Sequence, residues 1–474
     1  DEKSQKIVED NKTKLSKITG ESFDEFGVKS LVMPEQIENS HSTNSFLIDE
    51  SSGLEQLSQK QITYLKHWSV LQELRSLSDE IIFDFQYEEE LVSFTRDPLY
   101  GLQWNLDRVQ LEPALNAIGQ DVKNVAVAVI DSGGPSPSSP AWNQSNLIDG
   151  GLDFVYGDNN SIDYFATSSY TGNEASHGTH VSTTIALKNN NVDFNGYAVH
   201  ALNINVFDQN PNRTPIIANS TENAVLYAAG LPNVSGLVAP NTIPIKVINL
   251  SLKKVGNISY PTAYCQVMSD AISQGITVVA AAGNDQDTSP GLVSYPASCN
   301  GVVSVGATNS GGSITYYSQQ NSSVDISAPG GDTVDRDGNG VADTILAYGN
   351  DSQPAGLGGT SMAAPQVSAA IALMYSVDSS MTPSRVNNMI AAGEMSDDRG
   401  ATGKDNAFGY GELNVAKAIE NVLEDISSDT TFAYTDVPYL NFATNTTQLN
   451  VSLNKVGTGS LSVTSLSADN ASGL

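Results

Sequence analysis

The sequence is poor in cysteine and in basic residues, and it lacks any long apolar run. Its 474 residues include two cysteines, Cys265 and Cys299, which leaves either one disulfide or two buried free thiols. No run of eighteen apolar residues occurs, so we expect no membrane-spanning helix. The 23 Lys and Arg residues face 53 Asp and Glu residues, which gives a formal net charge of -30. This acidity argues against nucleic acid or an anionic membrane as a partner.

A recognisable secretion signal is also lacking, since the chain opens with Asp1-Glu2-Lys3. If the protein is secreted, we expect that signal to have been removed. What the sequence does have is a hydrophobic fraction of 39%, which suffices for one large core with smaller flanking units. We therefore expect two or three parts rather than one compact domain.

The stretch from Gly358 to Pro365 carries the clearest chemical pattern. Its small residues predict a turn that presents the Ser361 hydroxyl at the start of an apolar helix running to about Tyr375. A serine hydroxyl is a weak nucleophile, so it needs a base within hydrogen-bond reach and a third group that orients the base. Taken alone, the same serine is more simply explained as a helix N-cap.

The base and its orienting group are predicted upstream. Val125 to Ile130 is a short apolar run typical of a buried parallel strand, and Asp131 follows it, at the strand end where open α/β sheets place their sites. His177 opens a second apolar segment and is the predicted base. Taken singly, Asp131 is explained as a turn residue, and His177 with His180 as a structural pair. The three residues in this order predict a catalytic triad.

At this point the chain resembles the subtilisin-like serine peptidases, in the motifs Asp131–Gly133, His177–His180 and Gly359–Pro365. The order Asp, His, Ser is that of subtilisin, and the resemblance covers about residues 98 to 424. It implies a secreted, monomeric serine endopeptidase that cleaves protein or peptide substrates through an acyl-enzyme and needs no organic cofactor. The alternative is a catalytically silent subtilisin-like scaffold used for binding. A metal hydrolase built on the two histidines fails, because no Glu follows His177 in an H-E-x-x-H pattern.

Apolar runs and helical segments alternate through the same region, which predicts an α/β fold with a mostly parallel sheet flanked by helices. Strands are expected at residues 125–130, 202–206, 247–252, 276–280, 302–306 and 324–330. Helices are expected at residues 219–229 and 262–274, and from the nucleophile turn to about Tyr375.

The resemblance further implies which residues hold the substrate. In the family, an Asn at the position of Asn284 donates its side-chain amide to the oxyanion of the tetrahedral intermediate; an ordinary turn Asn is the alternative. The strand that ends near Ser251 is implied to pair with the substrate backbone. The residues assigned to substrate binding are Ser251, Leu252, Lys253, Ala281, Ala282, Gly283 and Ser294. In a secreted peptidase, one pair of cysteines favours a Cys265–Cys299 disulfide.

The chain departs from the family pattern at three places. Ser182 and Thr183 stand where the family has Ala-Gly, so close helix packing must be achieved in another way. Lys253 stands where the family has Gly, and we expect it to narrow the pocket or attract acidic side chains, with Asp285 as an ion-pair partner at the rim. The loop at residues 209–216 lacks the Gly-rich edge strand that pairs with the substrate in the family.

A calcium-loop pattern lies between Gly330 and the nucleophile turn. Oxygen-bearing residues alternate along 335–343, with a glycine to turn the chain. The expected ligands are Asp335, Asp337, Asn339, the carbonyl of Val341 and Asp343. The twelfth place holds Leu346 rather than a bidentate Glu, so we expect weaker binding or a ligand from elsewhere. A plain acidic turn is the alternative.

The segments on either side of the predicted catalytic domain, residues 97–424, differ from it in character. Residues 1–96 are charged and rich in Ser and Gln, and by position the resemblance implies a prosegment that inhibits the enzyme. A disordered or adaptor-like extension is the alternative. In residues 425–474 apolar residues alternate with Ser, Thr and Asn, which predicts the start of a β-sandwich-like module that the chain truncates.

Overall fold

The computed structural model describes residues 96–118, 125–163, 176–208, 214–240, 242–254, 262–336, 338, 340–429, 432–435 and 453–456. Almost all of these residues belong to one unit of the chain, formed by residues 92–433 and 455–474. The predicted prosegment and most of the predicted C-terminal module lie outside the described residues.

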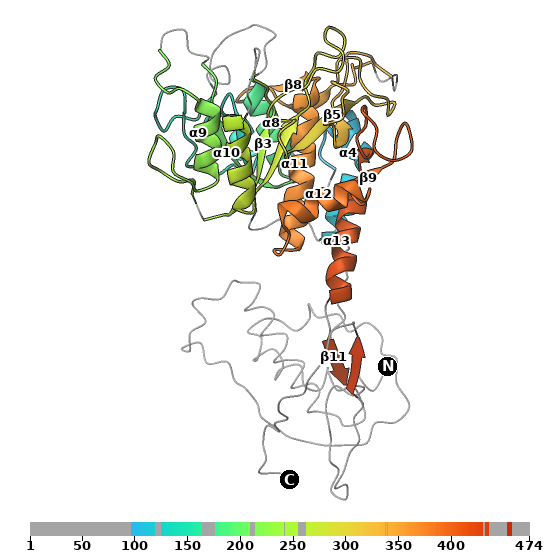
Figure 1. Ribbon diagram of the computed structural model, residues 1–474. Coiled ribbons are helices and arrows are strands. Elements are labelled where there is room, and N and C mark those ends of the chain that lie inside the picture. The colour runs from blue at the N-terminus through green and yellow to red at the C-terminus, as the bar shows by residue number, and fades with distance from the viewer. Residues whose placement is uncertain are drawn as a thin grey trace, which may run out of the picture. The chain divides into compact units, whose positions relative to one another are not determined.

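An eight-stranded sheet forms the centre of the described structure (Figure 1), with the strand order β2-β1-β3-β4-β5-β6-β10-β9. Its strands are β1 (Ala126–Asp131), β2 (His200–Asn205), β3 (Ile245–Leu250), β4 (Thr277–Ala281), β5 (Val303–Thr308), β6 (Ile326–Pro329), β9 (Ser396–Asp397) and β10 (Glu412–Leu413). Every neighbouring pair is parallel except β10 with β9. The predicted fold class, a mostly parallel sheet flanked by helices, is confirmed.

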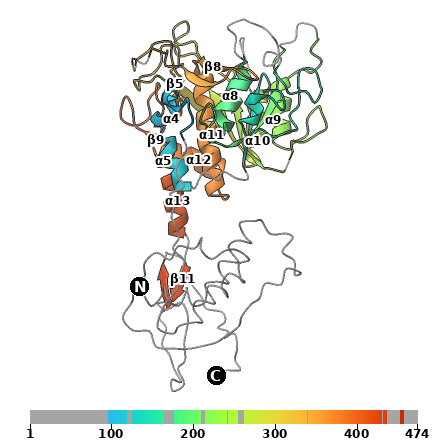
Figure 2. The ribbon, with the colours of Figure 1, turned by 180° about the vertical axis from the view of Figure 1, so that it is seen from behind.

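Helices cover both faces of this sheet, which is why its central strands are mostly apolar on both faces. Successive residues of β1 alternate between two cores: Val127 and Val129 belong to one, and Ala128 and Ile130 to the other. The first core is shared with α5 (Leu111–Ile118), α8 (His177–Ala186), α11 (Thr360–Val377), α12 (Pro383–Ala391) and α13 (Val415–Asp429). The second is shared with α9 (Ser220–Ala228) and α10 (Thr262–Ser273), which lie together away from α5 and α13 (Figure 2).

The chain changes direction across the sheet at β1. From β1 it crosses to β2 on one side, and the later strands β3 to β6 add in sequence on the other. Open α/β sheets bind ligands at such a switch point, outside the carboxyl ends of the strands. Asp131 is the last residue of β1, and Ser251 directly follows β3, the neighbour of β1. The topology therefore brings these two residues to one edge.

The predicted strands and helices are all present, with ends that differ by a few residues. The structure adds elements that the sequence did not predict: α5, α12, α13, the short strands β9 and β10, and a hairpin of β7 (Ile345–Tyr348) and β8 (Pro354–Leu357) that leads into α11. Shorter elements are η3 (Tyr100–Leu102), α4 (Trp104–Arg108) and α6 (Pro140–Asn143), and a separate two-stranded sheet joins β11 (Phe432–Thr435) and β12 (Leu453–Val456). Within the described residues, no helix combines the length and the apolar character needed to cross a bilayer.

Candidate active site

Asp131 and His177 meet through a short hydrogen bond. Asp131 is fully buried at the end of β1, and His177 is the first residue of α8. The Nδ1 of His177 lies 2.7 Å from Oδ1 of Asp131, and the Ser132 backbone N–H donates to the same oxygen at 2.7 Å. A carboxylate accepts at this distance, so Nδ1 carries the proton and the lone pair of Nε2 is available. The imidazole itself is 38% exposed, so a substrate can reach it.

A second carboxylate, that of Asp163, lies near the imidazole. Asp163 is fully buried and accepts the Ser132 hydroxyl at 2.6 Å and the Ser176 hydroxyl. Burial lowers the pKa of His177, but the charge of Asp131, its hydrogen bond and the charge of Asp163 together outweigh burial, so the pKa is raised above its ordinary value. Asp163 is not among the residues predicted for the site.

The sequence signal for this contact is the glycine that follows Asp131-Ser132, which indicates a close approach of backbone without showing which segment approaches. Gly133 has φ +102, and a Cβ there would lie 2.5 Å from the carbonyl oxygen of Ser161. Next to it, the Asp163 N–H donates to the Gly134 carbonyl at 2.8 Å. The segment that carries Asp163 therefore lies directly against the end of β1, and a glycine is required for this close approach.

His180, one turn along α8, has a structural role in this arrangement. It is fully buried, and its Nε2 lies 3.0 Å from the Ile345 carbonyl and 3.2 Å from the Ala355 carbonyl, one on each strand of the β7–β8 hairpin. Burial lowers the pKa of His180 to about 4. In the unfolded chain this imidazole binds a proton below about pH 6.5. As the pH falls from there towards 4, the unfolded state gains a proton that the folded state does not bind, so the free energy of unfolding decreases.

The two polar residues that replace the family's Ala-Gly are accommodated inside the helix. Ser182 and Thr183 are both fully buried. Their hydroxyls donate to the Thr179 carbonyl at 3.2 and 2.8 Å. Each buried hydroxyl has a partner in the preceding turn, so neither Ser182 nor Thr183 leaves its own hydroxyl unpaired.

Ser361 lies in the first turn of α11 and is tied to the segment after β3. Its hydroxyl donates to the Ser251 carbonyl at 3.2 Å, while the Ser251 hydroxyl donates to the Ser361 carbonyl at 2.8 Å. In an unbroken helix the Ser361 carbonyl would accept the N–H of residue 365. That residue is Pro365, which has no N–H, so the carbonyl is free for Ser251. Within the described residues, no hydrogen bond joins Ser361 to His177, and such bonds often shorten only when substrate binds.

The contact between Ser361 and Ser251 continues into the protein as a buried polar chain. The carboxamide of Asn249, fully buried on β3, donates to the Ser251 hydroxyl at 3.1 Å and accepts the Ser368 hydroxyl at 2.8 Å. Ser368 belongs to α11, as Ser361 does. Two links, one at Ser361 and one at Ser368, therefore hold the first half of α11 against the end of β3.

Asn284 follows β4 and is oriented by the residue before the nucleophile. Its side-chain oxygen accepts both the backbone N–H of Thr360, at 2.9 Å, and the Thr360 hydroxyl, at 2.8 Å. This leaves the Asn284 Nδ2 as a donor towards the site. Nδ2 and the Ser361 backbone nitrogen lie 3.2 and 3.6 Å from the point that a Cβ on Gly359 would occupy. Glycine at 359 thus leaves open a space beside two donors.

The residues assigned to substrate binding gather beside this turn. Ser251 and Leu252 follow β3, Ala281 ends β4, and Ala282 and Gly283 come next. The Lys254 N–H donates to the Tyr295 carbonyl at 2.9 Å, so the segment after β3 runs along the one that holds Ser294. Lys253 and Asp285 form the expected ion pair, with about a third of each side chain exposed. Of the loop at 209–216, residues 209–213 lie outside the described residues.

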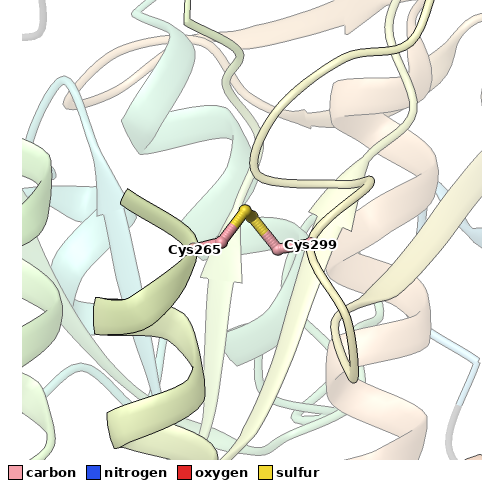
Figure 3. The surroundings of a disulfide bond; sticks show 2 residues. All are labelled: Cys265 and Cys299. Atoms are coloured by element: carbon pink, nitrogen blue, oxygen red, sulfur yellow. A yellow bond between two sulfur atoms is a disulfide. The ribbon is translucent and has the colours of Figure 1, made fainter. Parts of the chain in front are cut away.

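The predicted disulfide is present (Figure 3). Cys265 lies on α10 and Cys299 in the loop between β4 and β5, with Cα atoms 5.2 Å apart and a sequence separation of 34. The bridge ties α10 to the long loop between β4 and β5, which also carries Asn284. The alternative of two free thiols is excluded.

The predicted calcium loop is described only in part, because Asp337 and Asn339 lie outside the described residues. The two carboxylate oxygens of Asp335 accept the N–H groups of Gly338 at 2.8 Å and Gly340 at 2.9 Å. Asp343 is buried and accepts the N–H of Arg336 at 2.9 Å. Among the described residues, no group of three His, Cys, Asp or Glu side chains is placed to hold a metal.

The site can be compared with known proteins. The model of the subtilase family matches residues 122–411, more than half of the chain. An extracellular protease of Xanthomonas campestris pv. campestris is 34% identical over 286 residues, which are 56% of this chain and 46% of that protein. Subtilisin amylosacchariticus of Bacillus subtilis subsp. amylosacchariticus is 33% identical over 311 residues, covering 65% of this chain and 69% of that protein.

Among solved structures, a protease of Pseudoalteromonas arctica is similar, with a TM-score of 0.56 and 26% identity over 70% of this chain and all of that one. The chain spans less than half the length of the Xanthomonas relative and about two thirds of the Bacillus one. The family match includes Asp131, His177, Asn284 and Ser361. The chain belongs to the subtilase family and is a subtilisin-like serine peptidase.

Proposed function

We propose that the chain is an endopeptidase that hydrolyses peptide bonds in proteins through an Asp131–His177–Ser361 triad and an acyl-enzyme. The proposal rests on one observation: two contacts lie at the same edge of the sheet. Asp131 holds the imidazole at the end of β1, and Ser251, just past the end of the adjacent strand β3, holds the Ser361 hydroxyl.

The chemistry follows from these positions. Ser361 Oγ attacks the scissile carbonyl carbon while its proton passes to Nε2 of His177. Asp131 keeps the Nδ1–H tautomer and stabilises the imidazolium. The oxyanion accepts hydrogen bonds from the Asn284 Nδ2 and the Ser361 N–H. His177 then returns the proton to the leaving amine, and water repeats the sequence to release the acyl group from Ser361.

Ser361→Ala tests the reaction. The variant is expected to lose activity down to the level that the oxyanion donors and substrate binding provide alone. Turnover of a protein substrate is measured, together with labelling by a serine-directed phosphonate and mass analysis of the labelled peptide. Activity in Ser361→Ala equal to that of the wild type contradicts the triad. A wild type that binds peptides but neither cleaves them nor takes the label supports the silent scaffold instead.

We propose calcium as a structural ion at loop 335–343, held by Asp335, Asp337, Asn339, the Val341 carbonyl and Asp343. Two observations support it. The family generally binds structural calcium, and the Asp335 carboxylate is already turned into its own loop by two backbone N–H groups, as expected of the first ligand in such a loop. The bound ion neutralises several nearby carboxylates and so stabilises the folded state.

Thermal melting tests the calcium proposal without relying on activity. Chelation is expected to lower the melting temperature, and Asp337→Ala is expected to reproduce that loss in excess calcium. Asp351→Ala, in the hairpin turn beyond this loop, is the control that keeps the response to calcium. Equal melting temperatures with calcium and with chelator would show an acidic turn that binds no ion.

Three features outside the described site remain proposals. We place a catalytic domain at residues 97–424 between an inhibitory prosegment and a β-rich accessory module, and we propose secretion because relatives include a protein named an extracellular protease. N-terminal sequencing of the active enzyme tests release near residues 94–97. Gel filtration of the phosphonate-labelled enzyme tests the proposal that it is a monomer.

A further inference from the structure

An ion pair lies unusually near the Ser361 turn. Lys253 is two residues beyond Ser251, whose carbonyl accepts the Ser361 hydroxyl at 3.2 Å. Two residues of chain span at most about 7 Å. The backbone of Lys253 therefore starts close to the nucleophile, and its ammonium contacts the Asp285 carboxylate.

Asp285 reaches the same place from a different segment. It directly follows Asn284, whose side-chain oxygen accepts the Thr360 N–H at 2.9 Å. The preceding residue, Gly283, has φ +114, and a Cβ there would lie 2.9 Å from the Ser294 Oγ and 3.7 Å from the Asp285 Oδ2. The ion pair thus joins two segments that each contact the nucleophile turn.

The space beside the pair also contains an unsatisfied polar group. Ser294 is 5% exposed, and its hydroxyl has no hydrogen-bond partner among the residues that the structure describes. A buried donor without a partner is costly, and this hydroxyl lies against the backbone of Gly283, between the two segments that the ion pair joins. The reachable part of this region is the ion pair, with about a third of each side chain exposed, and it lies beside the nucleophile, where the substrate side chain next to the scissile bond must lie.

We propose that the Lys253–Asp285 ion pair is the charge filter of this side-chain site. This rests on the proposed peptidase function. While the two charges are paired they cancel, so the site favours uncharged side chains. A basic side chain is attracted by Asp285 but repelled by Lys253, and an acidic one meets the reverse. Removing one partner leaves the charge of the other unpaired. The site then prefers substrate side chains whose charge is opposite to the one that remains.

Reciprocal variants test the filter. Lys253→Gln is expected to raise kcat/KM for substrates with Lys or Arg before the cut about fivefold relative to Leu. Asp285→Asn is expected to do the same for Glu or Asp. A rim charge that is a third exposed gives an effect of about this size. The double variant is expected to return to the wild-type preference, and the gains of the single variants are expected to shrink at 1 M salt.

A matched ion pair serves as the control. Lys404 and Asp325 lie 2.9 Å apart with side chains 32% and 25% exposed, close to the 32% and 30% of Lys253 and Asp285. Lys404→Gln and Asp325→Asn change the net charge of the protein equally but are expected to leave the preference unchanged. All rates are divided by the concentration of sites that take the phosphonate label, so a partly unfolded variant does not distort the profile.

The outcomes separate the two proposals. A wild type that takes no label and cleaves no peptide overturns the peptidase function, and the filter with it. A wild type that cleaves, with single variants whose preference for charge matches that of the wild type, overturns the filter alone. Equal shifts in the variants of Lys404 or Asp325 also overturn it, because the effect would then come from net charge rather than position.

Discussion

The two halves of the site are held in place by different kinds of interaction. The half that carries His177 depends on buried charge: the carboxylates of Asp131 and Asp163 are both fully buried, and both raise the pKa of the imidazole. The half that carries Ser361 depends on neutral hydrogen bonds: the Ser251 hydroxyl donates to the Ser361 carbonyl, and the Asn284 side-chain oxygen accepts the Thr360 N–H.

The difference matches what each half must stabilise. Negative charge near the imidazole favours the imidazolium that forms when the base takes a proton. The same charge near Ser361 would oppose the oxyanion, so neutral donors suit that half. Asp285 lies beside Asn284, but Lys253 pairs with it. We therefore expect substitutions in the half that carries Ser361 to change the positions of the oxyanion donors. Substitutions in the half that carries His177 are expected to change the pH dependence of kcat/KM.

The largest expected effect concerns the covalent brace of the neutral half. The Cys265–Cys299 bridge closes a loop with a separation of 34 residues, and this loop contains Asn284. In the chain-entropy model such a bridge stabilises the fold by about 4 kcal/mol, an upper-range value. Chemical unfolding of the Cys265→Ser/Cys299→Ser variant is expected to show a free energy of unfolding that is lower by up to this amount. Unfolding curves that coincide with those of the wild type would contradict it.

The second prediction removes the proposed oxyanion donor. Asn284→Ala is expected to lower kcat about a hundred- to a thousand-fold with little change in KM, a range measured for the equivalent donor in subtilisin itself. Thr360→Val removes the hydroxyl that orients Asn284 and is expected to cost less, since the Thr360 N–H still holds the side-chain oxygen. A rise in KM at constant kcat would make Asn284 a substrate-binding residue instead.

Much of the fold and of the candidate site could be predicted because the signals are local. The apolar strands are continuous runs, and Asp131, His177 and Ser361 lie in three short motifs whose order along the chain carries the prediction. The same holds for the disulfide, because a chain with two cysteines allows one pairing. The short strands β9 and β10 were missed because two residues each carry no periodic signal.

Other features depend on contacts between distant segments. Asp163 lies in a long polar stretch, and nothing in that stretch distinguishes a buried carboxylate from a solvated one; its burial follows from the close approach to Gly133. The orientation of Asn284 is set by Thr360, 76 residues away. Lys253 was expected to meet Asp285 only because the resemblance had already placed both near the nucleophile.

The smallest expected effect tests the charged half and concerns Asp163. The imidazole must be neutral to act as a base, so kcat/KM falls on the acid side as His177 gains a proton. The charge of Asp163 raises the pKa of His177. Asp163→Asn keeps the size of the side chain and an oxygen acceptor for Ser132 or Ser176 but removes the charge. The pKa of His177 is therefore expected to fall.

The measured sign of this shift decides the role of Asp163. The acid limb of the kcat/KM profile is expected to move to lower pH, so that the variant retains a larger fraction of its maximal activity than the wild type below the wild-type midpoint. Asp425→Asn removes one exposed charge on α13 and is expected to leave the limb in place. A residue that only supported the fold would lower activity at every pH without moving the limb. A limb that stays, or moves to higher pH, would show that the charge of Asp163 does not act on His177.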